Sequence, residues 1–204
     1  AKAASILYNE TGTVEEYLTK KLKLQGKTIK RLLIPTTAGT GAEITPFSVI
    51  YLNKVKYSLE HPNIKPEYVI LAPELTYNLS PRITAQTGCD ALAQAIESFW
   101  SANATEESKS YSREAIPLIL KNLEMAVNNP TPKSRRDMLI GAHLAGKSIS
   151  IAKTTAAHAL SYPLTACHNI SHCHAVMLTL PYFFPINSKA TPKNIHESLK
   201  LDYV

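Results

Sequence analysis

The stretch SPRITAQTGCDALAQAIESFW, residues 80–100, decides how the chain divides, because the first long helical pattern begins there. Ser80 and Pro81 are residue types that begin helices, and the apolar side chains after them recur at helical spacing. Asp90 and Gln94, at positions i and i+4, share one helix face among small and apolar residues. Burying such a carboxylate is costly unless a metal ion, an Arg or a Lys meets it. The stretch alone equally allows Asp90 to serve as a helix cap or dipole partner.

Further helical patterns follow this stretch to the end of the chain. They are TEESKSYSREAIPLILKNLEMAV (105–127), PKSRRDMLIGAHLAGKSISIAKTTAAHALSY (132–162) and HCHAVMLTLPYFFPIN (172–187). The second is expected to form one continuous helix. The third contains Pro181 and Pro185, which are expected to break or kink it.

The first third of the chain shows strand patterns instead. RLLIP (31–35) and YVILAP (68–73) are short apolar runs ending in proline, which predict buried strands. SVIYL and KYSLE predict a hairpin around Asn53, and residues 1–20 are expected to be helical. The fold class is therefore α/β followed by all-α, with predicted domains at residues 1–78 and 79–204.

Composition narrows the functional classes. The 204 residues carry a net charge of +6, and no apolar run approaches the ~20 residues that span a bilayer. The basic segment 19–31 has no interleaved aromatic residue, so we expect a solvated surface rather than a nucleic-acid site. Three cysteines do not make a disulfide framework, and the cytoplasm is the simplest setting.

The segment IPTTAGTGAE (34–43) is a candidate phosphate or ribose site. Gly39 and Gly41 flank Thr40 directly after a predicted strand, and backbone N–H groups and hydroxyls suit phosphate oxygens. The segment matches neither a Walker loop nor a GxGxxG motif. A plain tight turn remains the alternative.

Histidines and cysteines near the end of the chain suggest a metal site without fixing its ligands. His158 lies in an Ala-rich helical pattern, where a lone histidine is more often a core residue than a ligand. CHNISHCH (167–174) holds Cys167, His168, His172, Cys173 and His174. The cysteine spacing does not match a structural zinc site, and five neighbours are too crowded for one ion.

Together these motifs resemble the iron-containing (group III) alcohol dehydrogenase family. The matches are IPTTAGTGAE, PELTYNLSPRITAQTGCDALAQAIES, and His158 followed by His172 and Pro181, in the family's order and spacing. The resemblance implies a Rossmann-like nucleotide domain followed by a helical metal-binding domain, the architecture shared with dehydroquinate synthase. It also implies a divalent metal that polarises an alcohol or aldehyde oxygen, and NAD or NADP as hydride carrier.

The resemblance assigns site residues by position. Asp90, His158 and His172 fall on metal-ligand positions, so that only His172 of the 167–174 cluster is expected to bind. Gln94 replaces the fourth ligand of the iron type, a histidine, which gives zinc more weight than iron. Tyr162 stands where a histidine near the substrate is common. Cys167 and His168 are expected to face elsewhere, Cys173 takes a place usually held by Gly, and His174 either lines the cleft or lies on the surface.

The cofactor positions carried over from the family are Thr36, Thr37, Gly39, Thr40, Lys56, Thr76 and Leu79. The family's Gly-Gly-Gly-Ser run, which precedes an Ala-Lys pair, is absent, and the chain begins at Ala1 and Lys2. We therefore expect an internal segment of a longer enzyme that is inactive in isolation.

The substrate is expected to be a small alcohol or aldehyde. Several motifs are similar to members that reduce phosphonoacetaldehyde, and Lys147, if its helix is continuous, or Lys153 is a candidate cation for a phosphonate. Both are otherwise solvated helix lysines. A dehydroquinate-synthase-like lyase and a non-catalytic fragment are the alternatives. No nucleic acid or membrane partner is expected, and a homodimer is one option for the assembly.

Overall fold

The order of the elements is α/β first and all-helical afterwards, as the sequence predicts. The computed structural model describes residues 1–53 and 55–189, so residues 190–204 of the second predicted domain lie outside the described part. The first part holds α1 (Lys2–Leu7), α2 (Val14–Leu18), β1 (Leu32–Leu33), β2 (Phe47–Leu52), β3 (Val55–Glu60) and β4 (Tyr68–Val69). A short 3-10 turn at Pro62–Ile64 lies between β3 and β4, and another at Pro73–Thr76 leads to the second part. The second part holds α3 (Pro81–Trp100), α4 (Glu106–Asn128), α5 (Pro132–Ala152), α6 (Ala156–His168) and α7 (His172–Ser188).

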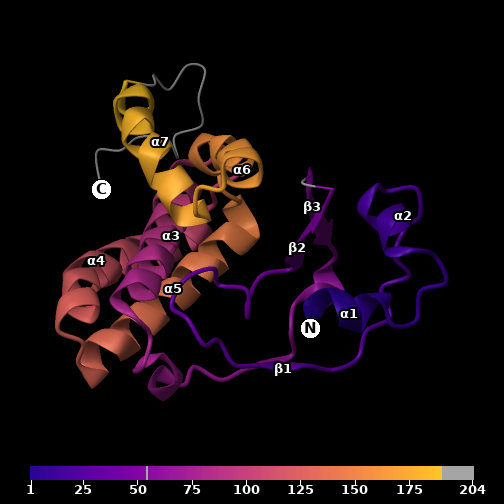
Figure 1. Ribbon diagram of the computed structural model, residues 1–204, viewed down its shortest axis with the longest axis horizontal. Coiled ribbons are helices and arrows are strands. Elements are labelled where there is room, and N and C mark those ends of the chain that lie inside the picture. The colour runs from indigo at the N-terminus through magenta and orange to yellow at the C-terminus, as the bar shows by residue number, and fades with distance from the viewer. Residues whose placement is uncertain (54, 190–204) are drawn as a thin grey trace.

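The long helices gather into one body (Figure 1). Helices α3, α4 and α5 pack against one another, and α7 packs on α3 and α6. Ser80, Thr105 and Thr131 cap α3, α4 and α5 by accepting a backbone N–H bond, which satisfies donors that a helix leaves free at its start. None of the helices that the structure describes is both long and apolar enough to cross a bilayer.

The predicted continuous helix over residues 132–162 is wrong. Lys153 adopts φ 64° and ψ 179°, a conformation outside the helical region, and ends α5. Helix α6 then begins at Ala156 in a new direction (Figure 1). By contrast, α7 runs through Pro181 and Pro185 without interruption, so these prolines do not break the helix, and a kink there stays a prediction. The expected helix over residues 1–20 is two short helices, α1 and α2.

Two small sheets form the first part. Strands β1 and β4 pair in parallel, with Leu32 opposite Tyr68, and β2 and β3 form the antiparallel hairpin that the sequence predicts. The expectation that β1 and β4 are buried is wrong, because Leu32 is 50% and Tyr68 62% exposed. Among the described residues the parallel pair has no third strand beside it, and Leu32 and Tyr68 are exposed while Leu33 and Val69 are partly covered.

The loop between β1 and β2 attaches the first part to the helices. Gly41 has φ +58°, and a Cβ atom there would lie 2.4 Å from the Cα of Gly146 on α5, so only glycine permits this approach. Beside this contact, Glu43 Oε1 lies 2.9 Å from His143 Nδ1 of α5. The loop leads directly into β2, and this docking therefore holds the hairpin over the helical body.

Candidate metal centre

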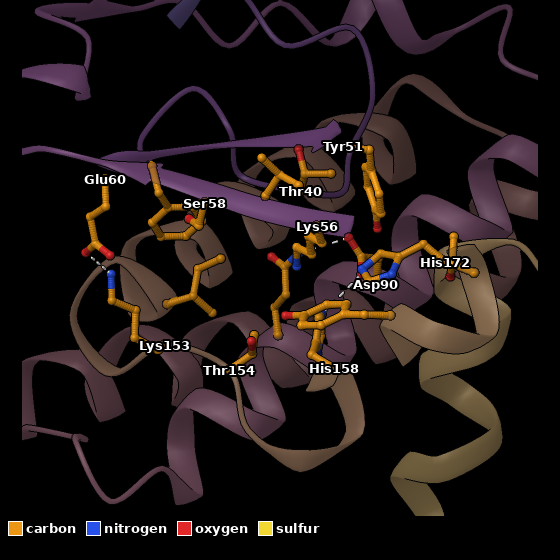
Figure 2. Close-up of a pocket in the computed structure, with 16 residues that line it drawn as sticks. Thr40, Tyr51, Lys56, Ser58, Glu60, Asp90, Lys153, Thr154, His158 and His172 are labelled. Atoms are coloured by element: carbon orange, nitrogen blue, oxygen red, sulfur yellow. Dashed lines mark hydrogen bonds and ion pairs between the residues drawn. The ribbon is translucent and has the colours of Figure 1, made fainter. Parts of the chain in front are cut away.

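Three side chains from three helices converge on one point. Asp90 lies near the middle of α3, His158 in the first turn of α6, and His172 is the first residue of α7. Asp90 Oδ1 lies 3.4 Å from His158 Nε2 and 3.6 Å from His172 Nε2, and the three potential ligand atoms lie within 4.8 Å of one another (Figure 2). We call Asp90, His158 and His172 the ligand cluster.

The ligand cluster contains buried polar atoms that the protein leaves without hydrogen bonds. Both residues are at least 95% buried, and their atoms Asp90 Oδ1 and His158 Nε2 have no hydrogen-bond partner in the protein. Buried polar atoms nearly always find partners, so two unpartnered atoms that converge with a third potential ligand atom indicate a place for a cation. One carboxylate oxygen and two imidazole nitrogens suit a divalent transition metal with an open coordination position. The residues present therefore fit such an ion.

Gln94 lies one turn after Asp90 and also faces this point. Its Nε2 donates a hydrogen bond of 2.9 Å to Asp90 Oδ2, while its Oε1 is buried without a partner. The amide thus fixes the orientation of the carboxylate. It leaves Asp90 Oδ1 free toward the two histidines.

The electrostatics of the ligand cluster differ between its histidines. Although burial disfavours the charged imidazole, the nearby carboxylates of Asp90 and Glu97 favour it and raise the pKa of His158 to about 9. His172 is half-buried, and burial lowers its pKa. In the metal-free protein at neutral pH the His158 imidazole is therefore protonated, and a metal ion has to displace a proton from it in order to bind.

Glu97 is the residue at this site that sequence reasoning missed. It is fully buried on α3, about two turns after Asp90, and hydrogen-bonds His158 Nδ1 through its Oε2. Burial alone would raise the pKa of Glu97, but bonds from His158 and Thr155 lower it below its ordinary value. The available signal was an acid in the mostly apolar second half of this helix, at a spacing that places it near the face of Asp90.

The ligand cluster opens into a cavity of about 660 Å³ between the β2–β3 hairpin and the helices. At its inner end, the Lys56 ammonium lies 3.3 Å from the centre of the Tyr162 ring, and that ring stacks on His172 at 6.2 Å. Burial lowers the pKa of Lys56 to about 8. The cavity therefore carries a cation and an aromatic side chain beside the ligand cluster.

The other end of the cavity carries a second cation. Lys153 pairs with Glu60 of β3, and its ammonium lies 4.8 Å from the centre of the Phe47 ring (Figure 2). Lys147, in contrast, lies over the Tyr111 ring at 5.0 Å and does not line the cavity. The expectation that Lys147 lies near His158 required one continuous helix. The bend at Lys153 divides that helix, so the expectation is wrong.

Only some of the predicted cofactor positions lie at the cavity. Thr40 and Lys56 line the cavity, whereas the other five, Thr36, Thr37, Gly39, Thr76 and Leu79, do not. Gly39 packs against Thr87, the Thr76 hydroxyl donates to Pro73 O at 2.7 Å, and the Leu79 carbonyl accepts from Arg135. Their cofactor roles stay predictions.

The neighbours of His172 lie apart from the ligand cluster. Cys167 and His168 are exposed in the last turn of α6, and His174 is exposed on α7. Cys173 is buried beside Cys89, and the neighbouring Cys173 thiol lowers the pKa of Cys89. Within the described residues, His172 is therefore the one member of the 167–174 segment in the potential metal site.

Comparisons with known proteins point to the same family for both parts of the chain. The profile of "Iron-containing alcohol dehydrogenase" matches residues 1–73, and that of "Fe-containing alcohol dehydrogenase family, C-terminal" matches residues 84–201. Long-chain-alcohol dehydrogenase 1 of Geobacillus thermodenitrificans is 40% identical over 185 residues, 89% of this chain and 47% of that protein. Phosphonoacetaldehyde reductase of Streptomyces viridochromogenes is 37% identical over 155 residues, 74% of this chain and 39% of that protein.

A solved structure shows the same fold. Sulfoacetaldehyde reductase from Bifidobacterium kashiwanohense, in complex with NAD+, superposes with a TM-score of 0.89 at 37% identity, covering 97% of this chain and 53% of that one. The chain thus spans about half the length of the relatives it matches. By its sequence and its fold, the chain belongs to the iron-containing alcohol dehydrogenase family.

Proposed function

We propose that the protein carrying this chain is a metal-dependent, NAD(P)-linked alcohol dehydrogenase or aldehyde reductase. The observation that carries the proposal is the pair of buried, unpartnered atoms Asp90 Oδ1 and His158 Nε2, which face His172 beside a large cavity. The membership of the chain in its family supports the hydride chemistry.

In this proposal Asp90, His158 and His172 hold one divalent metal ion, with Gln94 beside it. A bound metal supplies a Lewis acid that polarises the alcohol or carbonyl oxygen. Tyr162, stacked on His172, borders the substrate and limits the access of water to the ligand cluster. Lys56 directs its ammonium into the same space from β3, where it attracts an anionic cofactor or substrate group.

We further propose zinc as the native ion. Gln94 offers a neutral amide where an imidazole would serve iron better, and its Nε2 is already used by Asp90. Zinc accepts three protein ligands and an open position. Fe(II) binds more weakly to comparable ligands and gains more from an imidazole nitrogen as a fourth ligand.

An aldehyde with an anionic head group is the favoured substrate within this class. Lys56 and Lys153 are both at the cavity, accompanied by the hydroxyls of Ser58 and Thr154. Two of the similar proteins reported above are named for phosphonoacetaldehyde and sulfoacetaldehyde. Lys153 is paired with Glu60, so an anionic group would exchange with that carboxylate rather than meet a free cation.

A dehydroquinate-synthase-like lyase is less well supported. Such an enzyme would need several cations in the helical part to hold a carboxylate and a phosphate. Among the described residues, Lys153 is the one Lys or Arg of that part that lines the cavity.

The division into domains at residues 78 and 79 belongs to the proposal. A separate hydrophobic cluster around Ile6 and Ile64 supports it, although Ala38 and Leu71 of the first part pack into the cluster of the long helices. The homodimer and the cytoplasmic setting stay predictions.

The test is an assay of the complete protein with Zn(II) or Fe(II). We expect oxidation of NADH or NADPH with acetaldehyde, and a higher kcat/KM with phosphonoacetaldehyde. Lys153→Met should remove the preference for the anionic aldehyde and leave turnover of acetaldehyde largely intact. Equal rates with and without metal, for every aldehyde, would overturn the proposed function.

A further inference from the structure

Glu97 carries more hydrogen bonds than a helix cap requires, and they lead to the ligand cluster. Its Oε1 accepts from Thr155 N (2.9 Å), Thr155 Oγ1 (2.7 Å), Ala157 N (3.1 Å) and His158 N (3.4 Å). Thr155, the N-cap residue of α6, makes no side-chain cap bond to its own helix. Glu97 of α3 therefore caps α6 from outside, with a negative charge at the positive end of that helix.

The second oxygen of Glu97 acts on a ligand. Oε2 bonds His158 Nδ1, and the opposite ring nitrogen, Nε2, faces Asp90 Oδ1 at 3.4 Å. An ionised carboxylate can only accept, so Nδ1 must carry the proton in this contact. In the neutral imidazole, Nε2 then presents its lone pair to the centre of the ligand cluster.

The surroundings keep Glu97 in this position. Its carboxyl group is fully buried, and the indole Nε1 of Trp100, one turn further along α3, donates to Thr155 Oγ1 at 3.0 Å. That bond uses the acceptor side of the Thr155 hydroxyl, so that its proton points to Glu97 Oε1. The same carboxylate thus fixes the start of α6 and the ring of His158, which lies in its first turn.

We propose that Glu97 is a positioning residue for the metal centre, which selects the His158 tautomer able to bind a cation. The inference rests on the proposed function and adds a residue to which the comparisons assign no role. A purely structural cap would need only Oε1 and the backbone of α6. The bond from Oε2 to His158 Nδ1 is the part that a cap does not explain.

Glu97→Gln separates the two roles. The four donors at the start of α6 require an acceptor, so the Gln oxygen replaces Oε1 and its NH2 group faces His158 Nδ1. That group donates, Nδ1 becomes the acceptor, and the proton moves to Nε2, where it blocks metal binding. Thr155→Val is the matched control, because it removes a hydroxyl from the cap and leaves the His158 bond intact.

The experiment uses the complete protein, freed of metal and titrated with Co(II) against a chromogenic chelator. We expect E97Q to weaken Co(II) binding by roughly 10- to 100-fold and to alter the visible Co(II) spectrum. T155V should lower the unfolding temperature and keep the affinity and the spectrum. Equal weakening by both variants would assign Glu97 to capping alone, and unchanged binding by E97Q would also overturn the inference. If the unaltered protein binds no Co(II), the proposed function fails first.

A measurement on the unaltered protein does not depend on how E97Q folds. With 15N-labelled histidine and bound Zn(II), His158 should show a protonated Nδ1 and a metal-bound Nε2 in proton–nitrogen spectra. The reverse assignment would overturn the inference.

Discussion

Helix α3 contributes to two buried polar clusters that differ in one respect. One is the ligand cluster with Glu97. The other, which we call the serine cluster, joins Ser98 of α3, Ser112 of α4 and Ser148 of α5, all 0% exposed. Its hydroxyls lie 3.1, 2.8 and 2.7 Å apart, and two of them also lie within hydrogen-bond distance of a backbone carbonyl. Every hydroxyl of the serine cluster thus has a partner, whereas the ligand cluster leaves two buried atoms without one.

The difference shows which buried polarity indicates a ligand. The serine cluster completes its bonds within the protein, so its role is to join three helices. The ligand cluster completes its bonds only when a cation is added. Burial and polarity are common to both, and the unpartnered atoms separate them.

The largest expected effect comes from Asp90→Asn. The neutral amide keeps the size of the side chain and removes the one charged oxygen that faces both histidines. We expect loss of bound metal and a fall in turnover of at least about 1000-fold, equivalent to several kcal/mol in the transition state. Metal content by mass spectrometry and steady-state kinetics measure this, with circular dichroism to verify folding. A variant that keeps metal and activity would contradict the assignment of the ligand cluster.

The second largest effect is expected in how the stability of the metal-free protein depends on pH, because the ligand cluster contains titratable groups and the serine cluster does not. The folded-state pKa of His158, about 9, lies above its ordinary value of 6.5. The resulting stabilisation is therefore complete below about pH 6.5 and is lost as the pH rises through about 9, by up to about 3 kcal/mol. Bound metal replaces the proton and should remove this dependence. Urea unfolding of both forms across this range tests it, and identical profiles with and without metal would speak against it.

Gln94→His should sharpen the description of the ligand cluster. An imidazole in place of the partnerless Gln94 oxygen adds a fourth ligand on the face of Asp90. We expect the affinity for Fe(II) to rise by about tenfold, roughly 1.4 kcal/mol, and turnover to fall if the new ligand fills the place of the substrate. Metal content of protein purified without added metal compares the two versions. Stoichiometric iron in the unaltered protein, with no gain in the variant, would contradict the proposal of zinc.

The smallest effect is expected from Ser112→Ala. The variant removes the central hydroxyl, but Ser98 and Ser148 can still bond each other at 2.7 Å. We expect a loss of about 1 kcal/mol in the free energy of unfolding. Metal affinity should stay the same, because no hydroxyl of the serine cluster faces the cavity. Chelator competition and urea unfolding test both parts, and a tenfold change in metal affinity would show that the two clusters are coupled.

The sequence alone determined the order of the elements. Helix-start residues such as Ser80 and Thr105 act within a few positions, and the apolar spacing after them is a local property. The β2–β3 hairpin is likewise local, because strand pattern and turn are adjacent. The sequence also singled out Asp90, His158 and His172, but only through resemblance, since spacing along the chain left several ligand sets open.

Tertiary structure decided what depends on distant contacts. The bend at Lys153 separates α5 from α6 although the residues around it suit a helix, and the cap that stabilises the new start is Glu97, about sixty positions earlier. The same bend moves Lys147 away from the cavity and brings His158 to Asp90. The partners of a buried carboxylate are the donors that the fold brings to within about 3 Å of it, wherever they lie in the sequence. No local pattern can therefore show which donors will surround it.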